Sequence, residues 1–242
     1  MNLVKSTVEL VDTMGSDLTV VNAARVSFSQ ESWWQEQVED EVQARYTDGE
    51  WARSTDIIEK KVLNDKDSKL ISYLARHNHW TPFAHSFASF RIKAPIFVAR
   101  QLAKHQVGLA WNEVSRRYVD GEPEFFNPVA FRARAENVKQ GSSEEFVSCT
   151  DTLMKDYDDL CTYLCEVYNE MLKHEVAPEQ ARMILPQCAM TEWVWSGSLY
   201  AFSRICNLRL DPHAQAETGD IADMIDYYMR QIYPYSWEAL VK

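Results

Sequence analysis

The chain has 242 residues and a mass of 28.1 kDa, which suits one large domain or two small ones. Its 25 Lys and Arg against 36 Asp and Glu give a net charge of −11, so its mean field repels phosphate and argues against nucleic acid or an anionic membrane as partner. The longest stretch without Asp, Glu, Lys or Arg is 14 residues (77–90), whereas a membrane span needs about 20 apolar residues.

The N-terminal part shows strand and helix patterns in turn. Residues 8–15 predict a strand that leads into a turn, and Asp17 is placed to cap a short helix through Ala23. Residues 31–65 are polar, acidic and Trp-bearing, so we expect a helical insertion at the periphery. Helical spacing of apolar residues then predicts a helix over 65–77.

The middle of the chain holds the clearest strand pattern. Residues 86–94 alternate between apolar and polar, which predicts a half-buried strand. Pro95 follows at the first position of a helix expected over 96–105. Residues 114–119 predict another strand.

The second half is predominantly helical. Ser142 followed by Glu145 fits a capping box at the start of a long amphipathic helix that reaches Met171. The pattern then predicts a short helix from Pro178 to Pro186, a strand over 188–195, a helix over 199–208 and a last helix opened by Asp211-Pro212. Because the elements are not ordered as alternating strand–helix–strand units, we expect the α+β class, rich in helix with a small sheet.

Glycine usage restricts how a nucleotide could be bound. There are seven Gly, and the two nearest to each other in sequence, Gly108 and Gly121, are 13 residues apart. The dinucleotide fingerprint, the Walker A loop and the Gly-x-Ser-x-Gly elbow all need closer glycines, so none of them exists here. Any nucleotide must be held by side chains and helix ends.

Cysteine usage bears on the compartment and on catalysis. The five Cys are odd in number and include no Cys-x-x-Cys pair, which argues against a disulfide framework and a Cys-rich zinc site. The first six residues lack the apolar run of a signal peptide, so we expect a reducing compartment, the cytoplasm. No Cys has a neighbouring base in sequence, and we expect all five to be structural residues in apolar surroundings.

Positive charge is concentrated in one segment. Residues 91–117 carry one acid, Glu113, and six basic residues: Arg91, Lys93, Arg100, Lys104, Arg116 and Arg117. Arg100, Gln101 and Lys104 share one face of the predicted helix. Such a patch suits a small molecule that bears phosphate. The alternative is a solvated face that pairs with acids elsewhere in the chain.

Histidine and tryptophan offer further candidates. His77, His79 and His85 could hold a metal ion, although no acid lies between them to complete a site; the alternative is three structural histidines. Trp111 interrupts a polar run beside Asn112, and it could stack on a flat ring or simply pack in the core or an interface.

Residues 94–101, Lys104-His105-Gln106 and 112–118 together carry a family resemblance. They are similar to the signature of the flavin-dependent thymidylate synthases, which is Arg-His-Arg, seven residues, Ser and then Arg-Tyr. Further blocks match that family in the same order, at 8–12 with 24–28, 79–83, 181–186 and 207–215. The matches therefore span nearly the whole chain.

The chain departs from the family pattern at the flavin motif. Lys104 and Gln106 replace the two arginines, and eight residues separate Gln106 from Ser115. Ala84 stands where some members have Glu, and Ser198 and Tyr200 replace an Asn-x-Arg pair. The resemblance thus implies a chemically altered cofactor pocket.

The resemblance implies a single domain over residues 1–242, with a small antiparallel sheet surrounded by helices. It implies methylation of dUMP to dTMP, with methylenetetrahydrofolate as carbon donor and FAD, reduced by NADPH, as hydride source. It also implies a homotetramer in which each site is built from more than one subunit. The alternatives are a catalytically inactive nucleotide-binding protein on the same scaffold, and a histidine-metal hydrolase.

The resemblance also implies roles for individual residues. Arg209 would be catalytic, facing the uracil and favouring its N3-ionised form. The residues implied for dUMP are Gln101, Lys104, Glu113, Val114, Ser115, Arg116, Arg117, Arg182 and Arg209, with Arg117 and Arg182 on the phosphate. Those implied for FAD are Thr81, Lys104, His105, Gln106, Glu113, Ser198, Tyr200 and Arg204. The alternative for Arg182, Arg204 and Arg209 is surface ion pairing, and no metal is expected.

Overall fold

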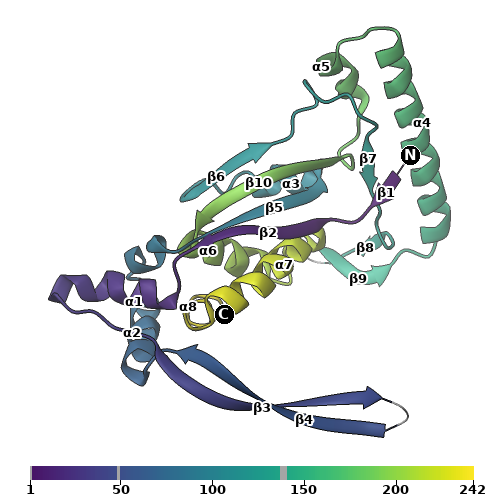
Figure 1. The fold of residues 1–242 in the computed structure, drawn as a ribbon. Coiled ribbons are helices and arrows are strands. Elements are labelled where there is room, and N and C mark those ends of the chain that lie inside the picture. Colours follow the sequence, from purple (N-terminus) through teal and green to yellow (C-terminus); the bar gives the residue numbers. More distant parts are fainter. Residues whose placement is uncertain (1, 48–49, 137–140) are drawn as a thin grey trace.

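A computed structural model describes residues 2–47, 50–136 and 141–242, with only the backbone described over 39–59 (Figure 1). The strands are β1 (Asn2–Val4), β2 (Thr7–Met14), β3 (Gln35–Thr47), β4 (Glu50–Val62), β5 (Phe87–Pro95), β6 (Leu109–Glu113), β7 (Glu124–Phe126), β8 (Arg132–Arg134), β9 (Ser142–Phe146) and β10 (Met190–Ser198). The α-helices are α1 (Asp17–Arg25), α2 (Asp65–Arg76), α3 (Ile96–Leu102), α4 (Thr150–Lys173), α5 (Pro178–Ala181), α6 (Leu199–Arg209), α7 (Ala216–Ile232) and α8 (Pro234–Leu240). Short 3-10 turns cover Val26–Phe28, Thr81–His85 and Arg182–Ile184. In these described ranges no helix is long and apolar enough to cross a membrane.

The main sheet has four antiparallel strands in the order β2-β5-β10-β6, which confirms the predicted α+β class with a small antiparallel sheet. Its central strand β5 shows the predicted alternation, because Ala88, Phe90, Ile92 and Ala94 are all buried. Each large apolar side chain buried in this way contributes roughly 1.5–3 kcal/mol, so one face of the sheet is fixed toward the core.

Helices from the C-terminal third cover that face of the sheet (Figure 1). The Phe90 ring meets the Phe202 ring of α6 edge to face, with centroids 5.1 Å apart. The Trp195 ring also meets the Phe202 ring, with centroids 5.5 Å apart. The Tyr233 hydroxyl lies 2.7 Å from the Phe87 carbonyl oxygen and 3.0 Å from that of Met14. The end of α7 is thereby tied to both β2 and β5.

Helix α1 begins one residue earlier than the Asp17 cap prediction requires. The cap is Ser16, and the helix runs to Arg25. Asp17 is buried and accepts hydrogen bonds from the backbone N–H groups of Tyr235 (3.2 Å) and Ser236 (2.8 Å). Ser and Asp are both good caps. Ser16 takes the cap position because the Asp17 carboxylate accepts from the N–H groups at the start of α8.

The helical insertion predicted over 31–65 is wrong where the structure describes it. Strands β3 and β4 pair as an antiparallel ribbon, from Gln35 opposite Val62 to Thr47 opposite Glu50, and Figure 1 shows this ribbon standing away from the main sheet. Residues 48–49 lie outside the described part, but their sequence, Asp-Gly, is a strong hairpin signal. The polar, acidic composition of the segment favoured the helix prediction over this hairpin signal.

Four further element predictions need correction. Residues 114–119 are not a strand: β6 ends at Glu113, and the Tyr118 N–H closes a turn on the Ser115 carbonyl. Ser142 begins strand β9, where its hydroxyl accepts from Arg132 Nε at 2.6 Å, so it caps no helix and α4 starts only at Thr150.

The last helix also differs. Asp211 closes a local turn by accepting from the His213 N–H at 2.8 Å, and α7 begins at Ala216. Helix α3 ends at Leu102 instead of continuing to 105. The other predicted helices and the strand near 188–195 are present within a few residues of their expected bounds.

Candidate functional site

The basic segment divides into two halves. Arg91 lies 2.8 Å from Glu192 and Lys93 pairs with Glu124, so these two cations follow the predicted alternative of ordinary ion pairing. The remaining four cations of the segment have no carboxylate partner in the described part of the chain: Arg100, Lys104, Arg116 and Arg117. The concentration of these four cations in one segment of an acidic chain suits an external anion such as a phosphate.

A first cavity lies beside the end of β6. It gathers four of the residues expected to bind dUMP: Glu113, Val114, Arg116 and Arg182. The Glu113 carboxylate accepts hydrogen bonds from Thr191 Oγ1 at 2.6 Å and from Trp111 Nε1 at 3.2 Å. Its position is therefore fixed by two strands.

The turn after β6 holds the neighbouring cations. Arg117 Nε donates to Ser115 Oγ at 3.2 Å, and Arg116 Nη1 donates to the Gly121 carbonyl at 2.9 Å. Arg182 Nε donates to the Glu179 carbonyl at 3.2 Å. In each case a backbone or hydroxyl oxygen orients the guanidinium and leaves its charge unneutralised, which suits a phosphate ligand.

A second cavity lies between α3, α6 and α7 and contains Gln101 and Arg209. Arg209 Nε and Nη2 lie 3.2 and 3.0 Å from Nε2 of His105. Burial, together with the charges of Arg209 and Arg204, lowers the pKa of His105. A neutral imidazole can accept from the guanidinium, so His105 orients Arg209. Sequence reasoning named both residues but gave no signal for this contact.

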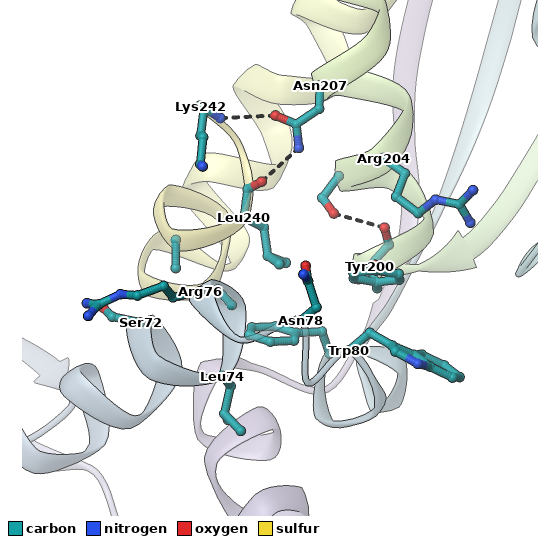
Figure 2. Close-up of a pocket in the computed structure, with 14 residues that line it drawn as sticks. Ser72, Leu74, Arg76, Asn78, Trp80, Tyr200, Arg204, Asn207, Leu240 and Lys242 are labelled. Atoms are coloured by element: carbon teal, nitrogen blue, oxygen red, sulfur yellow. Dashed lines mark hydrogen bonds between the residues drawn. The ribbon is translucent and has the colours of Figure 1, made fainter.

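A third cavity is shown in Figure 2 and lies between α2, α6 and α8. The Trp80 and Tyr200 rings approach to 5.9 Å between centroids, while Arg204 and Arg76 extend toward opposite sides. Trp80 also borders a neighbouring cavity that includes Thr81. Ser198, expected to touch FAD, is buried and caps α6 by accepting from the Ala201 N–H at 3.2 Å.

The structure thus distributes the expected residues over separate cavities of one chain. Lys104 and Gln106 are exposed on the turn after α3, next to His105. Trp111 stacks on Trp193 of the same chain, with ring centroids 4.3 Å apart, so one of its faces is already occupied.

The histidines and cysteines differ in part from expectation. The His77 ring lies 4.3 Å from that of Tyr73, and no cluster of three or more His, Cys, Asp or Glu among the described residues could hold a metal ion. Cys149 is exposed, which contradicts the expected apolar setting for all five cysteines. Burial raises the pKa of Cys161 to about 12 and also raises that of Cys206, so both stay protonated thiols.

Comparison with known proteins shows which family has this arrangement. Residues 9–235 match the family described as thymidylate synthase complementing protein. A flavin-dependent thymidylate synthase from Thermosipho africanus is 33% identical over 98% of this chain and 92% of its own, and one from Thermotoga neapolitana is 34% identical with the same coverage. The chain belongs to the flavin-dependent thymidylate synthase family. The resemblance read from the motifs is confirmed, and the chain is a methyltransferase.

A solved structure agrees with this family assignment. PolB from Streptomyces cacaoi, a UMP/dUMP methylase bound with 5-Br UMP, superposes with a TM-score of 0.79 at 26% identity, covering 99% of this chain and 95% of PolB. The two proteins therefore share the same overall fold.

The flavin implied by the family fits the residues present. FAD offers flat rings, a hydroxylated chain and a diphosphate. The third cavity offers the Trp80 and Tyr200 rings, and the exposed cations Arg204 and Lys104 have no carboxylate partner in the described ranges. Tyr200 supplies a ring at the position where the family motif has Arg, and an aromatic ring suits the flat rings of FAD.

Proposed function

We propose that this flavin-dependent thymidylate synthase methylates dUMP to dTMP, with methylenetetrahydrofolate as the carbon donor and NADPH as the reductant of FAD. The observation that carries the proposal is the concentration of four cations, Arg100, Lys104, Arg116 and Arg117, in one segment of an acidic chain, where none of them has a carboxylate partner among the described residues. A nucleotide monophosphate supplies the missing anion.

The first cavity supports binding of the nucleotide phosphate. We assign the phosphate to Arg182, which lines this cavity, and to Arg117, which follows the lining residue Arg116 in the chain. Both guanidinium groups are oriented by oxygen acceptors that carry no full charge. Glu113, held by Thr191 and Trp111, would lie between the nucleotide and the flavin. Ser115 supports this loop by orienting Arg117 and needs no role as a nucleophile.

The second cavity supports the role of Arg209 as the catalytic cation. Its guanidinium is partly buried, and burial strengthens its effect on a neighbouring negative charge. Neutral His105 orients it without neutralising it. Arg209 would thus favour the N3-ionised uracil, in which the ring is more electron-rich at C5.

The flavin would be held by Thr81, Lys104, His105, Gln106, Tyr200 and Arg204, and the buried Ser198 would contribute by capping the helix that carries Tyr200 and Arg204. When bound and reduced by NADPH, it supplies the hydride that completes the methyl group. The expected residues occupy different cavities of one chain, which supports a homotetramer whose sites combine residues from more than one subunit. We place the enzyme in the cytoplasm.

The decisive experiment is release of hydrogen from C5 of dUMP in the presence of methylenetetrahydrofolate and NADPH. Yellow, FAD-bearing protein that releases this hydrogen and consumes NADPH supports the proposal. Colourless protein that binds dUMP without release would favour an inactive nucleotide-binding protein. One metal ion per chain, with activity lost on chelation, would favour a histidine-metal hydrolase.

A further inference from the structure

The amide of Gln101 is held at one end by a buried hydroxyl. Gln101 lies on α3, is half-buried and lines the same cavity as Arg209. Its Oε1 lies 2.6 Å from Oγ1 of Thr218 on α7. A Gln carbonyl oxygen only accepts, so the Thr218 hydroxyl is the donor in this bond.

Thr218 is well suited to hold this bond rigidly. It lies in the first turn of α7, its side chain is fully buried, and its backbone N–H donates to the Gln215 carbonyl at 2.9 Å. A Thr side chain in a helix is restricted to two main χ1 rotamers, and complete burial together with the bond to Gln101 selects one of them. The terminal torsion of an isolated Gln is broad and roughly two-fold, and this bond selects one of its two orientations.

In this orientation, Gln101 presents its Nε2 amide hydrogens, which are donors, to the cavity. The Nε2 amide group of Gln101 has no hydrogen-bond partner among the residues that the structure describes. Arg209, whose Nε and Nη2 meet His105, adds the remaining N–H groups of its guanidinium. The Glu217 carboxylate borders the same cavity but already pairs with Arg132. Gln101 and Arg209 therefore form a donor-only surface.

We infer that Thr218 is a positioning residue that sets the pyrimidine selectivity of the enzyme, by turning the Gln101 amide donors toward a base carbonyl. The inference rests on the proposed function, because it takes this cavity as the site of the uracil ring. Uracil carries a carbonyl oxygen at C4, whereas cytosine carries an amino group there. An amino group facing the Gln101 donors leaves polar hydrogens unpaired, which a buried site penalises.

The test compares Thr218→Val, which removes the hydroxyl at nearly constant volume, with Thr218→Ser, which keeps it. Binding of dUMP and of dCMP to the FAD-loaded protein is measured by titration calorimetry. We expect Thr218→Val to weaken dUMP binding about three- to tenfold and to lower the dUMP-to-dCMP affinity ratio by a similar factor. Thr218→Ser should keep the ratio within about twofold of wild type. A role in packing alone would weaken both nucleotides equally.

A double-mutant cycle isolates the contact. In a Gln101→Leu background, Thr218→Val should cause no further loss of selectivity, because the amide it orients is gone. Thr218→Ala serves as a second hydroxyl-free variant, and circular dichroism checks that each variant is folded. An unchanged ratio in folded Thr218→Val or Thr218→Ala would overturn the inference while dUMP binding by the wild type still stands. Absence of dUMP binding by the wild type would instead overturn the proposed function and this inference with it.

Discussion

Arg209 is one side chain whose surroundings suit an electrostatic role. It is partly buried, and its guanidinium is oriented by a neutral acceptor. We expect Arg209→Ala to fold normally and to lose about 10²–10³ in the rate of dTMP formation, the usual cost of removing one preorganised donor. The measurement is turnover at saturating dUMP, with thermal unfolding as the control. Near-normal turnover would remove Arg209 from the mechanism.

His105 makes this arrangement sensitive to pH. Burial, Arg209 and Arg204 lower the pKa of His105 from its ordinary value of 6.5, so the ring stays neutral somewhat below that pH. Protonation ends its capacity to accept from Arg209, and we expect kcat/KM to fall on the acid side below pH 6.5. Because the unfolded state takes up the proton first, stability should also fall as the pH drops from 6.5 through the folded pKa.

A single substitution tests whether His105 causes this fall of kcat/KM at acid pH, the acid limb of the pH profile. Arg204→Gln removes one of the two cations that lower the pKa of His105, so the midpoint of the limb should move to higher pH. The pH dependence of kcat/KM for the two proteins gives the shift directly. A limb that stays in place would show that another group controls it.

Lys104 and Gln106 are the two departures with the clearest expected cost. Lys104 keeps a positive charge but lacks the planar fork of Arg, and Gln106 keeps donors without a charge. Hydrogen bonds to charged groups are worth about 1.5–3 kcal/mol, so restoring Lys104→Arg and Gln106→Arg together should tighten FAD binding by a factor of ten or more. Titration of FAD into apo-protein measures this. Equal affinity of the double variant and wild type would show that the motif change is neutral.

At the scale of residues, the motifs name candidate site residues but not the contacts between them. Arg209 and Gln101 were named from the sequence, whereas the Arg209–His105 and Gln101–Thr218 contacts join residues 104 and 117 positions apart. Such contacts follow from how three helices pack, and no local periodicity encodes them. Trp111 shows the same limit, because its stacking partner Trp193 belongs to the neighbouring strand.

Among the elements, α3 with the turn after it, and the turn after β6, carry the four cations that have no carboxylate partner among the described residues. We expect dUMP affinity to fall with added salt and with phosphate ion, and deoxyuridine to bind more weakly than dUMP, because exposed charges are screened. Arg91→Gln is a matched control for Arg117→Gln, since it removes the same charge from a residue already paired with Glu192. Of these two variants, only Arg117→Gln should reduce the preference for dUMP over deoxyuridine, with Arg182 retaining part of it. Equal affinity of the wild type for dUMP and deoxyuridine would show that no cation contacts the phosphate.

Elements with one buried face were predictable and those without one were not. Strand β5 alternates because its core face meets α6, and the pattern alone located it. The β3–β4 ribbon has no such constraint from the main sheet, and its composition indicated a helix instead. The helix starts near 142 and 211 failed because Ser and Asp hydrogen-bond locally in turns and strands as readily as at caps.

For the whole molecule, the separation of Arg182 and Arg209 into different cavities supports sites shared between subunits. Arg182→Ala and Arg209→Ala should each be inactive alone. Co-expressed in one cell, they should assemble mixed tetramers with about a quarter of the wild-type activity, because a shared site then draws each residue from a random subunit. Sites contained within single subunits would give no recovery on mixing.

The contacts of Asp17 and Tyr233 also bear on how the protein is made. Asp17 accepts hydrogen bonds from Tyr235 and Ser236, which lie 218 and 219 positions later in the chain. Tyr233 donates to the Phe87 carbonyl, 146 positions earlier. During synthesis, β2 and β5 leave the ribosome long before the residues that cover them. Contacts so distant in sequence slow folding, and the apolar face of a nascent sheet attracts other chains meanwhile. Translation that stalls before residue 233 should therefore release an aggregation-prone product, and chaperone supply should limit the yield of this enzyme in a cell.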